Sequence, residues 1–89
     1  MPYIEQIERP EFSPVAHGTP SAITSGQLNY QICELVINFL EARQLLNRQT
    51  RYTDYNEAIG AIECAKQEIY RKLIVPYEER KIRESGDVF

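Results

Sequence analysis

Aromatic and basic residues are interleaved over a short stretch near the carboxyl end of the chain. The cluster comprises Lys66, Tyr70, Arg71, Tyr77 and Lys81. Tyrosine rings stack on planar bases, and Lys or Arg neutralises phosphate, so this mixture suits a flat ligand that carries phosphates. On residue chemistry alone, half-buried tyrosines among solvated charges are the commoner explanation of such a pattern.

The distribution of charge points to the same part of the chain. The 89 residues have a formal net charge of -3, but residues 1–64 carry -4 and residues 65–83 carry +3. A net negative charge argues against DNA or RNA as a partner, because nonspecific binding to a nucleic-acid backbone requires the neutralisation of many phosphates. A small anionic ligand could still bind near the basic C-terminal segment.

Side chains that support catalysis are sparse. The single histidine, His17, lies in a Pro/Gly segment, and Cys33 and Cys64 lie in apolar helical patterns. Neither a Cys/His metal cluster nor a Cys/His nucleophile pair is therefore expected. There is no Gly-rich phosphate loop, nucleophile elbow or His-Glu-x-x-His motif. We expect a protein that is not an enzyme and holds no metal and no cofactor.

Residues 1–25 are predicted to form an irregular N-terminal arm. Four of the five prolines and Gly18 fall in this segment and exclude a long helix. Its apolar anchors could dock on the helices of the same chain or on a neighbouring subunit. These anchors are Tyr3, Ile4, Ile7 and Phe12.

A long amphipathic helix is predicted from about Ser25 to Asn47, because apolar residues recur there at steps of three and four. One row forms a core face: Leu28, Ile32, Leu35, Phe39, Ala42 and Leu46. A second row lies on the adjacent face: Tyr30, Cys33, Ile37 and Leu40. This apolar surface is wider than one partner helix needs, which predicts self-association, with a deeper intramolecular core as the alternative.

The polar residues 47–53 predict a connection to a second main helix. Asp54, three residues before Glu57, resembles a capping box, and Thr53 is a rival cap. The apolar spacing continues to Val75, where the next residue is a proline that must stop or kink the helix.

A short charged helix is predicted after Pro76, over residues 77–83, with Gly86 just past its end. The predicted fold is therefore all-α: a helical hairpin of two main helices, a short C-terminal helix after a proline kink and an irregular N-terminal arm, assembling as a homo-oligomer. We expect a single helical domain over residues 1–89, divided into the arm, 1–25, and a helical core, 26–89.

No membrane segment is expected, because the longest aliphatic stretch, Leu35-Val36-Ile37, is far too short to span a bilayer. The acidic N-terminus also lacks the basic and apolar regions of a signal peptide. We therefore expect the protein to stay in the cytoplasm in which it is made.

Several motifs resemble a family of small proteins of tailed phages and related metagenomic viruses. The resemblance covers about two thirds of the chain in collinear order. Its segments are residues 2–4 (Pro-Tyr-Ile), 26–30 (Gly-Gln-Leu-Asn-Tyr), 59–72, 76–78 (Pro-Tyr-Glu) followed by Lys81, and 86–89 (Gly-Asp-Val-Phe). Family members tend to have a continuous amphipathic segment after the opening motif, whereas Pro14, Gly18 and Pro20 interrupt it here.

This family is similar to the anti-CBASS sponges, oligomeric phage proteins that sequester cyclic dinucleotides such as 3′,3′-cyclic GMP-AMP without cleaving them. The resemblance implies a viral immune-evasion protein in the host cytoplasm, with the ligand at an interface between two copies of a homodimer or homotetramer. Asn29, suited to hydrogen bonds with base or ribose, and its neighbour Tyr30 join the cluster. The candidate nucleotide-binding residues are Asn29, Tyr30, Lys66, Tyr70, Arg71, Tyr77 and Lys81.

Two other classes of function compete with this interpretation. A phage accessory protein could bind a host or phage polypeptide through the apolar face of residues 28–46, in the helix-in-groove manner. An enzyme that degrades a signalling nucleotide is disfavoured, because the sequence offers neither metal ligands nor a plausible base.

Overall fold

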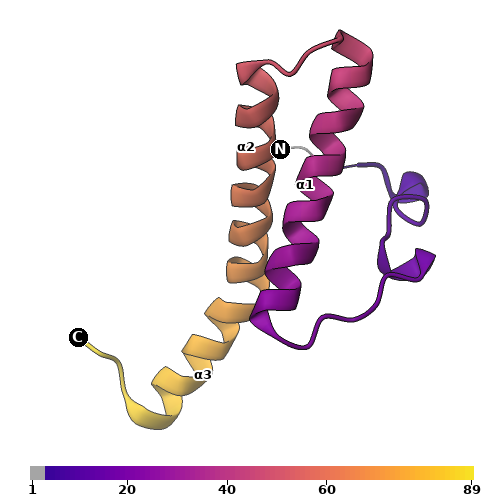
Figure 1. Ribbon diagram of the computed structural model, residues 1–89. Helices are drawn as coiled ribbons and strands as arrows, with labels where there is room; N and C mark the ends of the chain where they lie inside the picture. Colours follow the sequence, from indigo (N-terminus) through magenta and orange to yellow (C-terminus); the bar gives the residue numbers. More distant parts are fainter. Residues whose placement is uncertain (1–3) are drawn as a thin grey trace. The chain divides into compact units, whose positions relative to one another are not determined.

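The computed structural model describes residues 4–89, and within that range it contains helices and no strand (Figure 1). The elements are η1 (Gln6–Glu8), η2 (Val15–His17), α1 (Ser25–Asn47), α2 (Tyr52–Ile69), the π-helical turn η3 (Tyr70–Ile74) and α3 (Val75–Ser85). The all-α prediction, with two main helices and a short C-terminal one, is confirmed. The chain divides into two compact units: the first ends at Ala58, and the second is Ile59–Phe89.

The N-terminal arm contains only two 3-10 turns, as its prolines predict. It runs beside α1 (Figure 1), and the Gln31 side-chain amide donates a 2.7 Å hydrogen bond to the Pro20 carbonyl. Two of its apolar anchors, Ile7 and Phe12, remain 89% and 64% exposed, so they do not dock on α1 in the first unit. The anchor Tyr3 lies outside the described residues.

Helix α1 has the predicted bounds because both ends are capped. At the start, Thr24 Oγ1 accepts the Gln27 backbone N–H at 3.1 Å, and Gln27 Oε1 accepts the Thr24 N–H at the same distance. These reciprocal bonds form a capping box. At the end, Arg48 adopts a left-handed conformation (φ 66°) and its N–H bonds to the Gln44 carbonyl.

The first unit leaves the predicted core face of α1 largely exposed. Leu28, Leu35 and Leu46 keep half or more of their surface accessible, and Ala58 is the one buried hydrophobic residue within residues 4–89. Helix α1 therefore contributes an apolar surface that its own unit does not cover.

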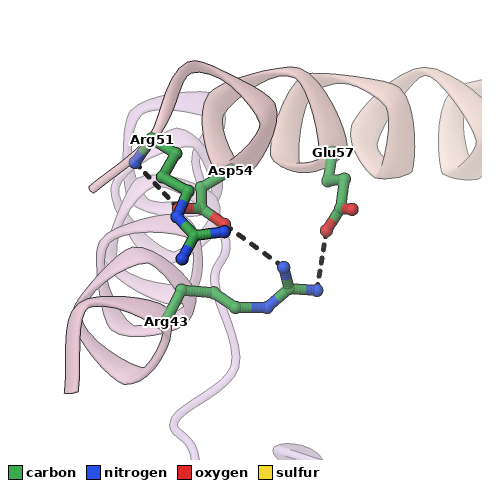
Figure 2. Close-up of polar contacts among 4 residues, drawn as sticks. All are labelled: Arg43, Arg51, Asp54 and Glu57. Carbon is green, nitrogen blue, oxygen red and sulfur yellow. Dashed lines mark hydrogen bonds and ion pairs between the residues drawn. The ribbon is translucent and has the colours of Figure 1, made fainter. Parts of the chain in front are cut away.

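The chain reverses direction after α1, and an arginine fixes the start of α2 against it (Figure 2). Arg43 Nη1 lies 3.2 Å from Asp54 Oδ1, and Arg43 Nη2 lies 2.6 Å from Glu57 Oε2. The guanidinium also lies 4.9 Å from the centroid of the Phe39 ring. Asp54 is 2% exposed, and its other oxygen accepts the Arg51 N–H at 2.9 Å. We call Arg43, Asp54 and Glu57 the arginine clamp.

The clamp corrects the predicted start of the second helix. Helix α2 begins at Tyr52, so Asp54 is its third residue, and its carboxylate reaches back to the N–H of Arg51, which precedes the helix. Asp54 thus supplies the backward half of a capping box rather than the N-cap itself. Glu57 contacts Arg43 instead of completing a box with Asp54.

In the second unit the helix bends at Pro76 without stopping (Figure 1). The backbone widens into η3, where the Val75 N–H bonds to the Tyr70 carbonyl five residues earlier. A widened turn relieves the clash between a proline ring and the carbonyl four residues before it. Pro76 is then the second residue of α3, which ends at Gly86 (φ 84°). The prediction of a kink is confirmed.

Candidate functional site

Five of the seven predicted binding residues lie in the second unit, and all five are exposed. Lys66 is on α2, Tyr70 and Arg71 are in η3, and Tyr77 and Lys81 are on α3. The residue types singled out in the sequence therefore occur around one π-helical turn, a feature that is frequent at functional sites.

Tyr70, at the first position of η3, has a ring that is 46% exposed. Its hydroxyl lies 3.4 and 3.5 Å from the two carboxylate oxygens of Glu78, to which it donates. Lys66, one turn earlier, lies 3.5 Å from Glu63 Oε1. The Glu78 carboxylate thus lies at the hydroxyl end of the Tyr70 ring, and Lys66 is a cation one helical turn before it.

Tyr77 is the second exposed ring, at 51%. The Arg80 guanidinium lies 5.8 Å and the Lys81 ammonium 5.6 Å from its centroid, both within cation–π range. These cations are three and four residues farther along α3, which is the spacing of neighbours on a helix surface. One ring therefore has two cations beside it.

Each basic residue of the predicted cluster has an acidic partner. Arg71 Nη2 lies 2.8 and 2.9 Å from the two oxygens of Glu68. Lys81 Nζ lies 3.4 Å from Glu84 Oε2. The second unit contains six basic and six acidic side chains, so it is formally neutral. Lys66, Arg71, Lys72 and Lys81 of the predicted basic segment are thus in ion pairs, and Arg80 and Arg83 are not, within residues 4–89.

The predicted site left these glutamates out, although their spacing was a signal. The pairs 63/66, 68/71 and 81/84 are all three residues apart, the distance at which helical side chains meet. The pairs 63/66 and 81/84 join exposed side chains and contribute about 0–1 kcal/mol each, whereas Glu68 is half-buried and also pairs with Lys72. An anionic ligand can therefore replace Glu63 or Glu84 at little cost, and Lys66 and Lys81 remain able to bind phosphate.

Asn29 and Tyr30, the other two predicted residues, lie on α1 in the first unit and are exposed. Tyr30 lines a groove of about 570 Å³ between the arm and α1. A hydrogen bond to the Glu34 carboxylate, its negative charge and a smaller contribution from desolvation raise the pKa of the Tyr30 hydroxyl above its ordinary value. The groove is otherwise mainly apolar, with walls that include Pro14, Val15, Pro20, Leu28, Ile32 and Leu35.

Within residues 4–89, no cluster of three or more His, Cys, Asp or Glu side chains could hold a metal ion. Cys33 and Cys64 form no disulfide, and Cys33 is exposed rather than packed. None of the helices in the described range is both long and apolar enough to cross a bilayer.

The fold and the exposed side chains define a small all-helical protein with aromatic and paired ionic groups around a π-helical turn. The chain belongs to the family described as Domain of unknown function (DUF6899), whose model matches residues 1–88. No curated protein matches the chain. No solved structure matches it either.

Proposed function

We propose that this protein is a non-catalytic sponge for cyclic dinucleotides, which binds a messenger such as 3′,3′-cyclic GMP-AMP and blocks host CBASS signalling during phage infection. The observation that carries the proposal is the exposed Tyr77 ring with Arg80 and Lys81 at 5.8 and 5.6 Å. A ring with adjacent cations can stack on a base and neutralise the phosphate attached to it.

The surrounding residues support the same ligand class. Tyr70 offers a second exposed ring, and Lys66 and Arg71 offer exposed cations, which pair with the exposed Glu63 and the half-buried Glu68. Ligand phosphates would replace these glutamates, because charge-assisted bonds from Arg or Lys to phosphate are stronger than exposed ion pairs. The resemblance of residues 59–72 and 76–78 to the sponge family supports this assignment.

A homo-oligomer is part of the proposal. The first unit leaves the apolar side chains of α1 uncovered, and a second copy would bury them. A cyclic dinucleotide has two bases and two phosphates, so a two-fold axis between copies would present the same residues to each half of the ligand. We propose a dimer or a tetramer in the cytoplasm of the infected cell.

The test is calorimetric titration of the protein with cyclic dinucleotides, followed by heat release and chromatography of the bound compound. We expect tight binding and recovery of the ligand unaltered. Arg71→Ala should weaken binding at least about tenfold, since it removes a charge-assisted contact. Arg83→Ala is the matched control, because Arg83 is outside the cluster and makes no ion pair within residues 4–89. Undiminished affinity of Arg71→Ala would remove the central residue of the proposal.

The exposed surface of α1 favours a second candidate function, the binding of a host or phage polypeptide. Leu35, Ile37 and Leu46 are half or more exposed on this helix, as a helix-in-groove partner would require. Co-purification of one protein at fixed stoichiometry, without any heat from nucleotides, would select this function.

A further inference from the structure

We propose that Glu78 reads the base that stacks on Tyr70 and makes this position selective for guanine. This inference rests on the proposed function and names the base recognised there. It starts from the two distances between the Tyr70 hydroxyl and Glu78, 3.4 Å to one carboxylate oxygen and 3.5 Å to the other. Both oxygens thus lie at the hydroxyl end of an exposed ring.

The position of Glu78 suits the edge of a stacked base. Tyr70 is in η3 and Glu78 is eight residues later on α3, so the bend brings a carboxylate from the next helix to the end of the ring. A base that stacks on the face of Tyr70 extends past the ring toward its hydroxyl. Its hydrogen-bonding edge then meets the Glu78 carboxylate.

The chemistry of that edge distinguishes the purines. Guanine presents two adjacent donors, N1–H and the N2 amino group, which match the two acceptor oxygens of an ionised carboxylate. Adenine presents one donor, the N6 amino group, beside the N1 acceptor, which would face the second oxygen and repel it. A bidentate contact of this kind gives about 1–3 kcal/mol of discrimination, or about tenfold and more in affinity.

A carboxylate at this position also opposes indiscriminate binding of anions, because it repels phosphate. Lys66, one turn before Tyr70, supplies the opposite charge. The ring therefore has a cation suited to phosphate and a carboxylate suited to a base with two donors. The neighbouring Glu79 is exposed, and its side chain makes no hydrogen bond or ion pair within the described part of the chain, so it is a matched control.

The experiment compares cyclic di-GMP and cyclic di-AMP by calorimetry, since these ligands have the same two phosphates and differ only in the bases. The wild-type protein should bind cyclic di-GMP at least about tenfold more tightly. In Glu78→Gln the amide offers one acceptor and one donor, which match the N6 amino group and N1 of adenine and equally N1–H and O6 of guanine, so the preference should disappear. Glu79→Gln should keep the wild-type preference.

The outcomes separate the two proposals. If neither ligand nor cyclic GMP-AMP binds the wild-type protein, the proposed function is overturned together with this inference. If the ligands bind the wild-type protein without preference, or if Glu78→Gln keeps both its helical circular dichroism and the wild-type preference, only the guanine assignment is overturned.

Discussion

The two units use their charged residues in opposite ways. In the first unit, the Asp54 carboxylate is 2% exposed and accepts from both Arg43 and the Arg51 N–H. In the second unit, the pairs Lys66–Glu63 and Lys81–Glu84 join side chains that are all more than half exposed. Buried, fully bonded charge fixes a backbone, whereas exposed charge exchanges its partner readily.

This difference assigns separate tasks to the two regions. The Asp54 carboxylate of the arginine clamp is buried and both of its oxygens accept hydrogen bonds, so the task of the clamp is to set the turn between α1 and α2. The exposed Lys66–Glu63 and Lys81–Glu84 pairs add little to stability. Buried charge in the first unit therefore stabilises the fold, whereas these exposed charges of the second unit contribute little to it and, under the proposed function, meet the ligand.

The largest expected effect is on the clamp. Asp54→Ala should lower the free energy of unfolding by about 2 kcal/mol, because it leaves Arg43 Nη1 and the Arg51 N–H without their acceptor while Glu57 still pairs with Arg43 Nη2. Asp54→Asn keeps an oxygen that can accept the Arg51 N–H, so its free energy of unfolding should fall by less. Urea denaturation at one fixed protein concentration measures both values. The control, Glu57→Gln, removes a 53% exposed partner of Arg43 and should cost less than about 1 kcal/mol. Equal losses in all three variants would break the contrast between the units.

A smaller gain is expected at the end of α1. Arg48→Gly should raise the free energy of unfolding by about 1 kcal/mol, because glycine adopts the left-handed conformation found at φ 66° without steric strain. The same denaturation experiment measures it. Asn47→Gly, one residue earlier inside the helix, should instead lower stability by a few tenths to about 1 kcal/mol. A loss of stability in Arg48→Gly would contradict the prediction.

In the second unit, Glu63→Gln should change the free energy of unfolding by less than about 0.5 kcal/mol, because the pair with Lys66 is exposed. Thermal denaturation followed by circular dichroism suffices to measure it. A loss of 2 kcal/mol or more would show that these pairs stabilise the fold as the clamp does.

The smallest effect concerns Tyr30. The folded pKa is raised above the ordinary value of 10.0, so the hydrogen bond to Glu34 stabilises the fold below pH 10, and this contribution is lost as pH rises through the folded pKa. Titration of the Tyr30 ring carbon by NMR should give a midpoint above 10. Glu34→Gln should lower that midpoint toward 10, and Glu41→Gln, on the same helix, should leave it unchanged.

Much of the fold could be predicted because local signals agree with the final structure. The spacing of apolar residues predicted where α1 begins and ends, and Thr24 and Gln27 cap its start. The start of α2 was misplaced, since an aspartate at a helix start can act as the N-cap or as the third residue that reaches back. Pro76 predicts an interruption of the helix. Whether the helix stops, kinks or widens there depends on how the structure relieves the clash between the Pro76 ring and the carbonyl of residue 72.

The aromatic and basic residues of the candidate site could be predicted from the sequence, but the acidic residues beside them were left out of the prediction. The tyrosines and the basic residues could be identified from the sequence, and so could the glutamates three residues away from the basic residues. The contact between Tyr70 and Glu78 could not, because an eight-residue separation matches no helical neighbour and arises from the bend. Asn29 and Tyr30 lie on α1 in the first unit, and their part in binding stays a prediction.

The π-helical turn also determines how far the side chains of α3 are rotated about the helix axis relative to those before the turn. Each residue advances an α-helix by about 100°, so the additional residue held by a π turn changes the azimuth of every side chain that follows. A helical wheel drawn continuously from residue 52 to residue 85 would therefore misplace Tyr77 and Lys81 relative to Lys66. The number of residues in segment 70–74, more than their identity, determines the direction in which α3 presents its ring and cations.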